Sequence, residues 1–125
     1  MSDQPRLSVE ITDHEGLPVV HVRGEIDLYT VPEFEQALQE GINRGGPALI
    51  ADLSDVPYLD SAGLSVLFAA YKALLARNAI LYVVAHLGQP GVCRVLEVTR
   101  LDTLIRVRGT VEDVIKELQT AGVSG

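Results

Sequence analysis

Apolar and polar residues alternate with a period of two at the start of the chain, which is typical of strands. Val9 and Ile11 alternate with polar neighbours, and the alternation resumes in residues 19–26 (VVHVRGEI). Residues 13–18 (DHEGLP) lie between the two segments and are of the types found in turns. The pattern therefore predicts two antiparallel strands joined as a hairpin.

The spacing of apolar residues then becomes helical in residues 29–42, which predicts an amphipathic helix. Thr30 is a candidate N-cap for this helix, and Pro32 falls in its first turn, where proline is well tolerated. The apolar positions of the predicted helix are Val31, Phe34, Leu38 and Ile42.

Two continuous apolar runs, residues 48–54 (ALIADLS) and 79–85 (AILYVVA), are typical of strands buried on both faces. A helix predicted to follow Ser61 and to end at about Asn78 separates them, and a strand, helix, strand order implies parallel pairing. The remaining predicted elements are a helix in residues 89–100, a short edge strand in 104–108, and a helix in 110–122 that starts at Thr110 and stops at Gly122.

These elements predict one α/β domain over residues 1–125, with a core from about residue 7 to residue 118. Its sheet is mixed and mostly parallel, with an N-terminal antiparallel hairpin and about four helices. The net charge of −7 repels nucleic acid and anionic lipid, so we expect neither to be a direct partner. No signal peptide or membrane-spanning run is recognisable and Cys93 is the single cysteine, which together favour the cytoplasm.

Acidic residues gather where two predicted strands end. Glu25 and Asp27 close the second strand, and residues 51–61 (ADLSDVPYLDS) place three aspartates before Ser61. Functional groups in open α/β sheets collect at the carboxyl ends of strands, so we expect several carboxylates around one hydroxyl. The three aspartates are Asp52, Asp55 and Asp60.

Ser61 allows three interpretations from the residues alone. It could be a helix N-cap, with a stabilising effect of about 1 kcal/mol. It could be a nucleophile, but the G-x-S-x-G turn is absent, and no histidine is close to it in sequence. It could also be a phosphorylation site, where a new charge at a helix N-terminus would act on a docked partner rather than on the fold.

The predicted helix after Ser61 is apolar over much of its surface. One stripe is wide enough to pack on the sheet, and a second side of small residues could be buried or could form a partner groove. The stripe consists of Leu64, Leu67, Phe68, Tyr71, Leu74 and Leu75, and the second side of Val66, Ala69, Ala70 and Ala73.

Other candidate sites have less support. The aspartates at 52, 55 and 60 could bind magnesium, but the phosphate-binding glycine loop of nucleotide hydrolases is absent. Cys93 is more typical of a small, partly buried residue than of a reactive thiol. We therefore expect no metal, no cofactor and no enzymatic activity.

Three segments of the chain resemble the STAS domain family, in particular the bacterial anti-sigma factor antagonists. Residues 53–72 (LSDVPYLDSAGLSVLFAAYK) resemble the family signature, in which an Asp-Ser pair precedes a small hydroxyl residue and Gly-Leu. Residues 24–30 (GEIDLYT) resemble the second-strand motif, and residues 92–107 (VCRVLEVTRLDTLIRV) resemble the late helix and edge strand. The resemblance covers nearly the whole chain, from about residue 7 to residue 118.

The resemblance implies a regulator in a partner-switching circuit. The unphosphorylated form of such a protein binds an anti-sigma factor, which is also a Ser/Thr kinase, and thereby frees the sigma factor. Phosphorylation by that kinase releases the antagonist, and a metal-dependent Ser/Thr phosphatase restores it. By this resemblance Ser61 is the phosphoacceptor, and the partner-binding residues are Asp27, Asp60, Ser61, Ala62, Gly63, Leu64 and Ser65.

The chain departs from the family pattern at three positions. Ala62 stands where many relatives carry a second hydroxyl residue, so Ser61 is the one hydroxyl of the DSAG motif. Ser65 replaces a common glycine, and Arg100 stands where a glycine often follows Thr99. If that position requires a left-handed backbone, arginine costs about 1 kcal/mol relative to glycine.

Two alternative functions remain open at this point. A STAS domain can also be a subunit of a membrane lipid transporter or a scaffold in a stress-signalling assembly. The other alternative, which has less support, is a nucleotide-hydrolysing enzyme that uses the acidic residues near Ser61.

Overall fold

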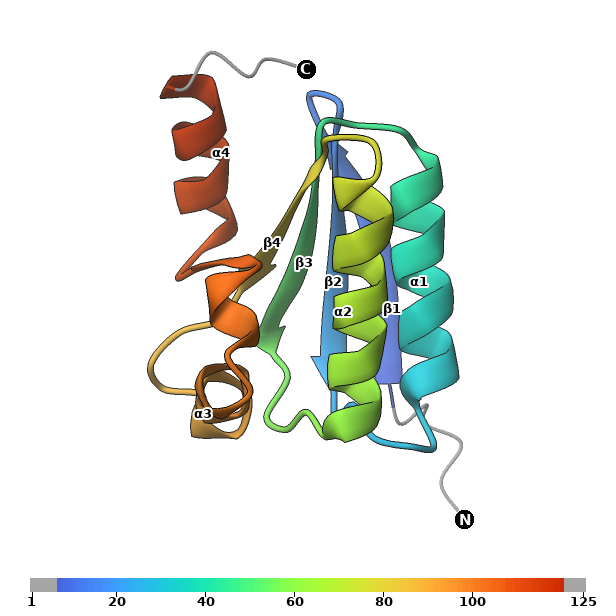
Figure 1. The fold of residues 1–125 in the computed structure, drawn as a ribbon, viewed down its shortest axis with the longest axis vertical. Coiled ribbons are helices and arrows are strands. Elements are labelled where there is room, and N and C mark those ends of the chain that lie inside the picture. Colours follow the sequence, from blue (N-terminus) through green and yellow to red (C-terminus); the bar gives the residue numbers. More distant parts are fainter. Residues whose placement is uncertain (1–6, 121–125) are drawn as a thin grey trace.

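The computed structural model of the chain describes residues 7–120, in which five strands form one sheet (Figure 1). The strands lie in the order in which they occur along the chain. The first two pair antiparallel, and each later strand pairs parallel with the one before it, as predicted. The strands are β1 (Leu7–His14), β2 (Leu17–Gly24), β3 (Ala48–Asp55), β4 (Ile80–Val84) and β5 (Arg106–Arg108).

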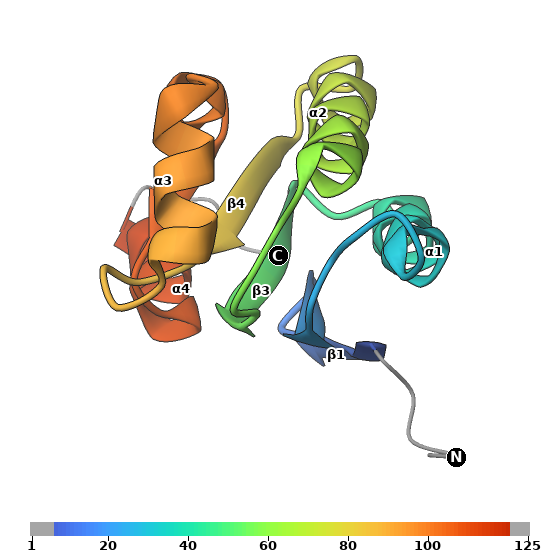
Figure 2. The ribbon, with the colours of Figure 1, turned by 90° about the horizontal axis from the view of Figure 1, so that it is seen from below.

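Four α-helices connect and cover the strands, which confirms the predicted number. Helices α1 and α2 lie on one side of the sheet and α4 lies on the other, as Figure 2 shows. The helices are α1 (Val31–Asn43), α2 (Ser61–Leu75), α3 (Pro90–Val98) and α4 (Val111–Thr120), and a short 3-10 helix, η1 (Leu101–Thr103), follows α3.

The turn between β1 and β2 is set by two residues with left-handed backbones. Glu15 has a φ of 53° and Gly16 a φ of 89°. Positive φ at both central residues is typical of a type I′ turn, whose twist matches that of the two strands. The hairpin is therefore confirmed, and its turn is only two residues long.

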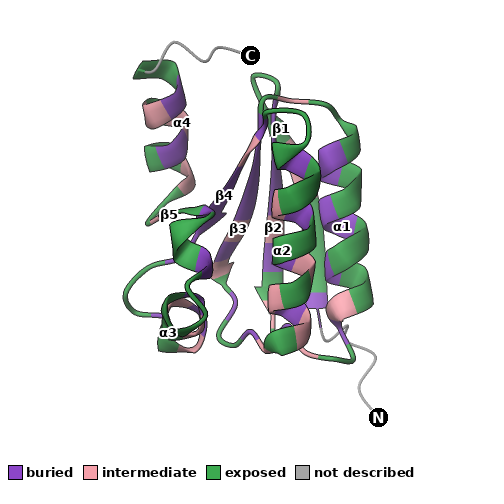
Figure 3. Cartoon of the chain, viewed as in Figure 1, coloured by how far each residue is buried: buried purple, intermediate pink, exposed green. Residues whose placement is uncertain are grey.

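Strands β2, β3 and β4 are largely buried (Figure 3), and the alternation of their side chains produces two separate cores. On β3, for example, Leu49, Ala51 and Leu53 face the helices α1, α2 and α3, whereas Ala48 and Ile50 face α4. All five of these side chains are buried. These strands read as continuous apolar runs because helices cover both faces of the sheet.

Helix α2 differs from its prediction at both its end and its buried face. It ends at Leu75, and Asn78 lies in the following turn with a φ of 60°. Phe68 and Leu75 were predicted to lie on the buried stripe, but they are 40% and 55% exposed, and Ala70 is buried instead. The helix packs on the sheet along Gly63, Leu67, Ala70 and Leu74, a narrower stripe than the apolar residues suggest.

The backbone at Arg100 is left-handed, with a φ of 62°. From the sequence, arginine is expected to be less favourable than glycine at this position if the backbone is left-handed. Because it is, arginine lowers the stability of the fold by about 1 kcal/mol relative to glycine. The strain lies at the junction between α3 and η1, which directs the chain toward β5.

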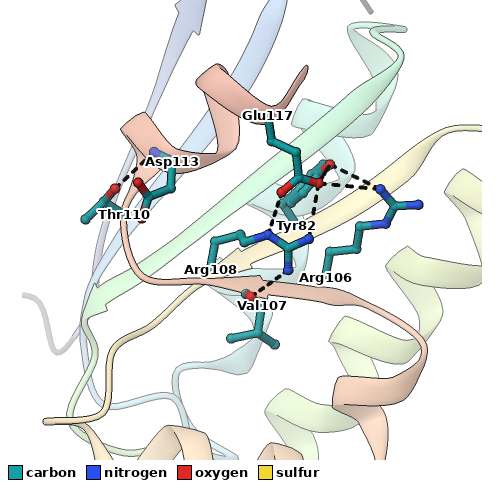
Figure 4. A network of polar contacts seen from close by, with 7 residues as sticks. All are labelled: Tyr82, Arg106, Val107, Arg108, Thr110, Asp113 and Glu117. Carbon is teal, nitrogen blue, oxygen red and sulfur yellow. Dashed lines mark hydrogen bonds and ion pairs between the residues drawn. The ribbon is translucent and has the colours of Figure 1, made fainter. Parts of the chain in front are cut away.

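Helix α4 is attached to the sheet by an ionic network (Figure 4). Glu117 accepts hydrogen bonds from the Tyr82 hydroxyl at 2.8 Å and from Arg108 Nε at 2.6 Å, and Arg106 Nη1 lies 3.6 Å from its carboxylate. The hydrogen bonds from Arg108 and Tyr82 lower the pKa of Glu117 to about 2. At the start of α4 the hydroxyl of Thr110 accepts the amide of Asp113, which agrees with the predicted start of this helix, whereas the predicted end at Gly122 lies outside the described residues.

The two edges of the sheet differ in length and charge. β5 has three residues, two of them arginines, whereas β1 has eight residues and pairs with β2 alone within the described part of the chain. Two carboxylates on β1 and three on the adjacent α1 are accompanied by no lysine or arginine in either element. No helix in residues 7–120 is long and apolar enough to cross a membrane.

Candidate functional site

Ser61 is the first residue of α2 and is exposed. Its hydroxyl has no hydrogen-bond partner among the described residues, although its carbonyl accepts the Ser65 hydroxyl at 3.0 Å. The side chain is therefore accessible and is not needed by the local structure. It lies near the carboxyl end of β3, where functional groups of open α/β sheets gather.

The N-cap of α2 is Asp60, so the interpretation of Ser61 as the cap is wrong. Asp60 has an extended backbone, and its Oδ1 accepts the amides of Ala62 at 2.9 Å and Gly63 at 3.2 Å. A carboxylate at this position satisfies two amides of the first turn and interacts favourably with the helix dipole. The capping function and the free hydroxyl therefore belong to two successive residues.

Asp27 lies in the neighbouring loop, which the structure joins directly to the segment before Ser61. Ile26 and Leu59 form a parallel bridge, and the amide of Asp60 donates to the carbonyl of Ile26 at 3.1 Å. The Asp27 carboxylate accepts the amides of Tyr29 at 2.9 Å and Thr30 at 3.1 Å. The predicted site residues Asp27 and Asp60 therefore lie on adjoining loops.

Thr30 occupies the predicted N-cap position of α1, but its side chain does not cap the helix. Its buried hydroxyl donates to the carbonyl of Glu25 at 2.8 Å and accepts the amide of Asp27 at 2.9 Å. These two bonds hold the loop after β2 in shape. The Asp27 carboxylate accepts amides that precede α1, so it also shapes this loop and does not cap the helix.

The remaining predicted site residues differ in how accessible they are. Ser65 is exposed, Ala62 and Leu64 are half-buried, and Gly63 is buried. A Cβ atom added to Gly63 would overlap Leu59 Cδ1 and lie 2.8 Å from Ile26 Cγ2. Glycine is therefore needed at 63 for close packing of α2 against the two loops, and it offers no side chain to a partner.

A groove of about 370 Å³ runs beside the first turns of α2. Ser61 and Phe68 form part of one wall, and Leu104, which is 46% exposed, forms part of the other. Most of the lining is apolar, so the groove can accept an apolar side chain of a partner. The lining residues are Ser61, Leu64, Ser65, Phe68, Thr99, Leu101 and Leu104.

Two of the predicted carboxylates are engaged elsewhere. Asp52 shares the face of β3 that carries Ile50 and points away from α2, and its carboxylate lies 2.8 Å from Nδ1 of His21. Asp55 forms an exposed ion pair with Arg23 at 3.5 Å. The expectation that Asp52 lies beside Ser61 is wrong, because alternation along β3 directs its side chain to the opposite face of the sheet. Within residues 7–120 no group of three or more side chains is placed to hold a metal ion.

Exposed apolar side chains near the site were missed by the sequence analysis. Leu28 is 69% exposed and Tyr29 75%, both in the loop that carries Asp27, and Tyr58 in the loop before Ser61 is 45% exposed. Leu28 and Tyr58 are large apolar residues outside the predicted strands and helices, and their position in loops was the signal available in the sequence. They extend the accessible surface around Ser61 with groups suited to protein contact.

Cys93 is half-buried, as expected, and its thiol donates to the carbonyl of His86 at 3.2 Å. Burial, with a smaller effect from the Glu97 carboxylate, raises the pKa of Cys93. The thiol therefore stays protonated at neutral pH, which disfavours reactivity.

Comparison with known proteins places these features in a family. The STAS domain model matches residues 8–114. The anti-sigma-B factor antagonist of Staphylococcus aureus is 34% identical over 106 residues, which cover 85% of this chain and 96% of that protein.

Solved structures agree with this match. The crystal structure of an anti-sigma factor antagonist from Mycobacterium paratuberculosis is 35% identical and has a TM-score of 0.82, covering 90% of this chain and 94% of that one. The unphosphorylated anti-sigma factor antagonist SpoIIAA shares the fold at 17% identity, with a TM-score of 0.73 over 94% of this chain and all of its own. The chain therefore belongs to the STAS domain family, together with these anti-sigma factor antagonists.

Proposed function

We propose that this protein is a cytoplasmic anti-sigma factor antagonist that works by partner switching. In its unphosphorylated form it binds an anti-sigma factor that is also a Ser/Thr kinase, and the sigma factor is released. One observation carries the proposal: the Ser61 hydroxyl is exposed and free of hydrogen bonds within the described residues, at the start of a helix bordered by an apolar groove. The protein acts as a binding partner and phosphoacceptor, not as an enzyme.

The docking surface combines the loop after β2 with the first turns of α2. Asp27 and Asp60 supply negative charge, and Ser61, Ala62, Leu64 and Ser65 supply the accessible face of the helix. Gly63 contributes by allowing the helix to pack closely on the two loops. A partner with a basic group beside an apolar side chain would match this surface, since opposite charges steer association and the groove buries apolar area.

Phosphorylation converts the same surface into a repulsive one. The Ser61 Oγ attacks the γ-phosphorus of ATP, a new O–P bond forms, the bond to the β-phosphate oxygen breaks, and ADP leaves. The hydroxyl proton passes to a base of the kinase. The product carries about −1.5 to −2 charges at pH 7. A metal-dependent Ser/Thr phosphatase would reverse the step by transferring the phosphoryl group to water.

The phosphoryl group would act on the partner more than on the fold. Asp60 already accepts the amides of Ala62 and Gly63, so those donors are not available to a phosphate on Ser61. The new charge therefore projects toward solvent and the groove, beside an existing carboxylate. A docked partner would lie close to both the phosphate and the Asp60 carboxylate. Its affinity for this surface would therefore fall.

Incubation with ATP and each anti-sigma kinase of the same genome tests the proposal. Mass spectrometry of the digested protein should find phosphate on Ser61 with at least one kinase, and Ser61→Ala should abolish the modification. Ser8→Ala is the matched control, because Ser8 is an exposed serine of β1 that lies outside the docking surface. Absence of phosphate on Ser61 with every kinase would refute the switch.

A further inference from the structure

One buried amide side chain joins the connection between β4 and α3 to the segment before Ser61. Gln89 is 7% exposed, and its Nε2 donates to the carbonyls of Leu53 at 2.6 Å and Val56 at 2.8 Å. Its Oε1 accepts the amide of His86 at 2.9 Å. Both amide hydrogens and the carbonyl oxygen are therefore used. Two of the bonds reach the end of β3 at Leu53 and the loop that follows it at Val56, and the third fixes the loop after β4 at His86.

The first turn of α3 touches the same segment. The amide of Leu59 donates to the carbonyl of Gly91 at 3.3 Å. A Cβ atom added to Gly91 would overlap the carbonyl oxygen of Pro57. A side chain at 91 would therefore displace either α3 or the loop, so glycine is required for this close approach.

The loop after β2 holds the segment from its other side. The amide of Ile26 donates to the carbonyl of Tyr58 at 3.0 Å, and the amide of Asp60 donates to the carbonyl of Ile26 at 3.1 Å. Residues 56–60 are thus bound by backbone hydrogen bonds on one side and by Gln89 and Gly91 on the other. Asp60 is the last residue of this segment, and its carboxylate sets the first turn of α2.

We propose that Gln89, supported by Gly91, is a positioning residue for Ser61. It contacts neither the Ser61 hydroxyl nor the groove, and it acts by fixing the loop that orients Asp60 and the start of α2. The connection between β4 and α3 therefore belongs to the functional site, although it offers no group to the partner. The functional meaning of this role rests on the proposed phosphorylation of Ser61, whereas the positioning itself does not.

The variant Gln89→Met tests the positioning. Methionine has nearly the volume of glutamine and deletes all three hydrogen bonds, which leaves two carbonyls and one amide without their partner. Gly91→Ala displaces the same loop by a different route and should act in the same direction. The control is a variant of a buried residue in α4, on the opposite face of the sheet: either Val114→Ala or Leu118→Ala. Of these two, the one whose loss of stability equals that of Gln89→Met is used.

Native-state amide hydrogen exchange is the first readout. At equal global stability, Gln89→Met should accelerate exchange at the amides of Val56, Leu59, Ala62 and Gly63 by about tenfold or more relative to the α4 control. If those amides exchange equally in the Gln89→Met variant and the control, Gln89 is only a core residue and the proposal is overturned.

Phosphorylation kinetics are the second readout. With a kinase that modifies wild-type Ser61, Gln89→Met should lower kcat/KM at Ser61 by about tenfold, because a loosened loop presents the hydroxyl in the correct geometry less often. The control should keep its kcat/KM, and an equal fall in both proteins would overturn the proposal. If no kinase modifies the wild type, the proposed function fails, and the exchange experiment alone decides whether Gln89 positions the loop.

Discussion

At the scale of single residues, Asp60 and Ser61 have separate roles at the start of α2. The carboxylate of Asp60 caps α2, so the neighbouring hydroxyl is left free for chemistry. A serine that capped the helix would have to give up its hydrogen bonds when modified. Here modification can change the surface without loss of a structural bond.

The two residues should therefore differ sharply when each is replaced by alanine. Asp60→Ala should lower the free energy of unfolding by about 1 kcal/mol, because two amides lose their acceptor. Ser61→Ala should change it by less than about 0.5 kcal/mol, as for an ordinary exposed position. Urea unfolding of both variants measures the difference, and an equal loss in the two would restore Ser61 as a cap.

Sequence reasoning singled out Asp60 and Ser61 but considered only Ser61 as the cap, whereas Asp60 caps the helix. An acid followed by a hydroxyl residue before a helix gives two candidate caps, and a shift of one residue in the start of the helix decides between them. The structural role of Gln89 could not be predicted from the sequence, because a glutamine before Pro90 belongs to no motif. Its importance arises from two carbonyls more than thirty positions away that the fold brings to it.

At the scale of elements, periodicity predicted the hairpin and the strand and helix order, because burial on a sheet imposes a period on the sequence. It was less accurate for α2, where Phe68 and Leu75 are exposed. An apolar residue satisfies the pattern of a buried stripe whether it packs on the sheet or faces a groove. The pattern alone cannot separate packing residues from residues available to a partner.

Helix α4 should show a pH-dependent attachment through Glu117. Its pKa of about 2 lies below the ordinary value, so the carboxylate stabilises the folded state fully above the unfolded pKa of about 4.5. This stabilisation should fall as the pH drops from about 5 to about 2. Glu117→Gln should destabilise the protein at neutral pH and reduce the slope of stability against pH in this range.

Urea unfolding at a series of pH values provides the measurement. Glu112→Gln is the matched control, since Glu112 is an exposed glutamate of the same helix that takes no part in the network. If the free energy of unfolding of Glu117→Gln depends on pH as that of the wild type does, the ionic network of α4 adds no pH-dependent stability.

At the scale of the whole molecule, one end of the sheet carries the candidate surface. The loops after β2, β3 and β4 are joined there by hydrogen bonds, and the first two carry exposed apolar residues around Ser61. The family resemblance identified this end from the sequence. The connections between the loops could not be predicted, because they depend on pairs of residues far apart in the chain.

Replacement of Ser61 by an acidic residue should separate binding from stability. Ser61→Glu should weaken binding to the proposed anti-sigma kinase by about tenfold or more, since a charge is added beside Asp60 at the proposed docking surface. Its melting temperature should stay close to that of the wild type, because Ser61 makes no side-chain bond within the described residues. Calorimetric titration and thermal unfolding measure the two quantities, and unchanged affinity would contradict electrostatic exclusion.

The long edge of β1 affects how the protein behaves in concentrated solution. An eight-residue edge strand could pair with the same strand of another molecule, as unprotected edges do when chains aggregate. The five carboxylates of β1 and α1, without a lysine or arginine in either element, make two such edges repel each other. Salt at about 1 M reduces the range of this repulsion to about 3 Å, so light scattering should detect association at high ionic strength before it does so at low. Charge at this edge thus acts against edge-to-edge pairing, as a proline, a bulge or a covering loop does in other proteins.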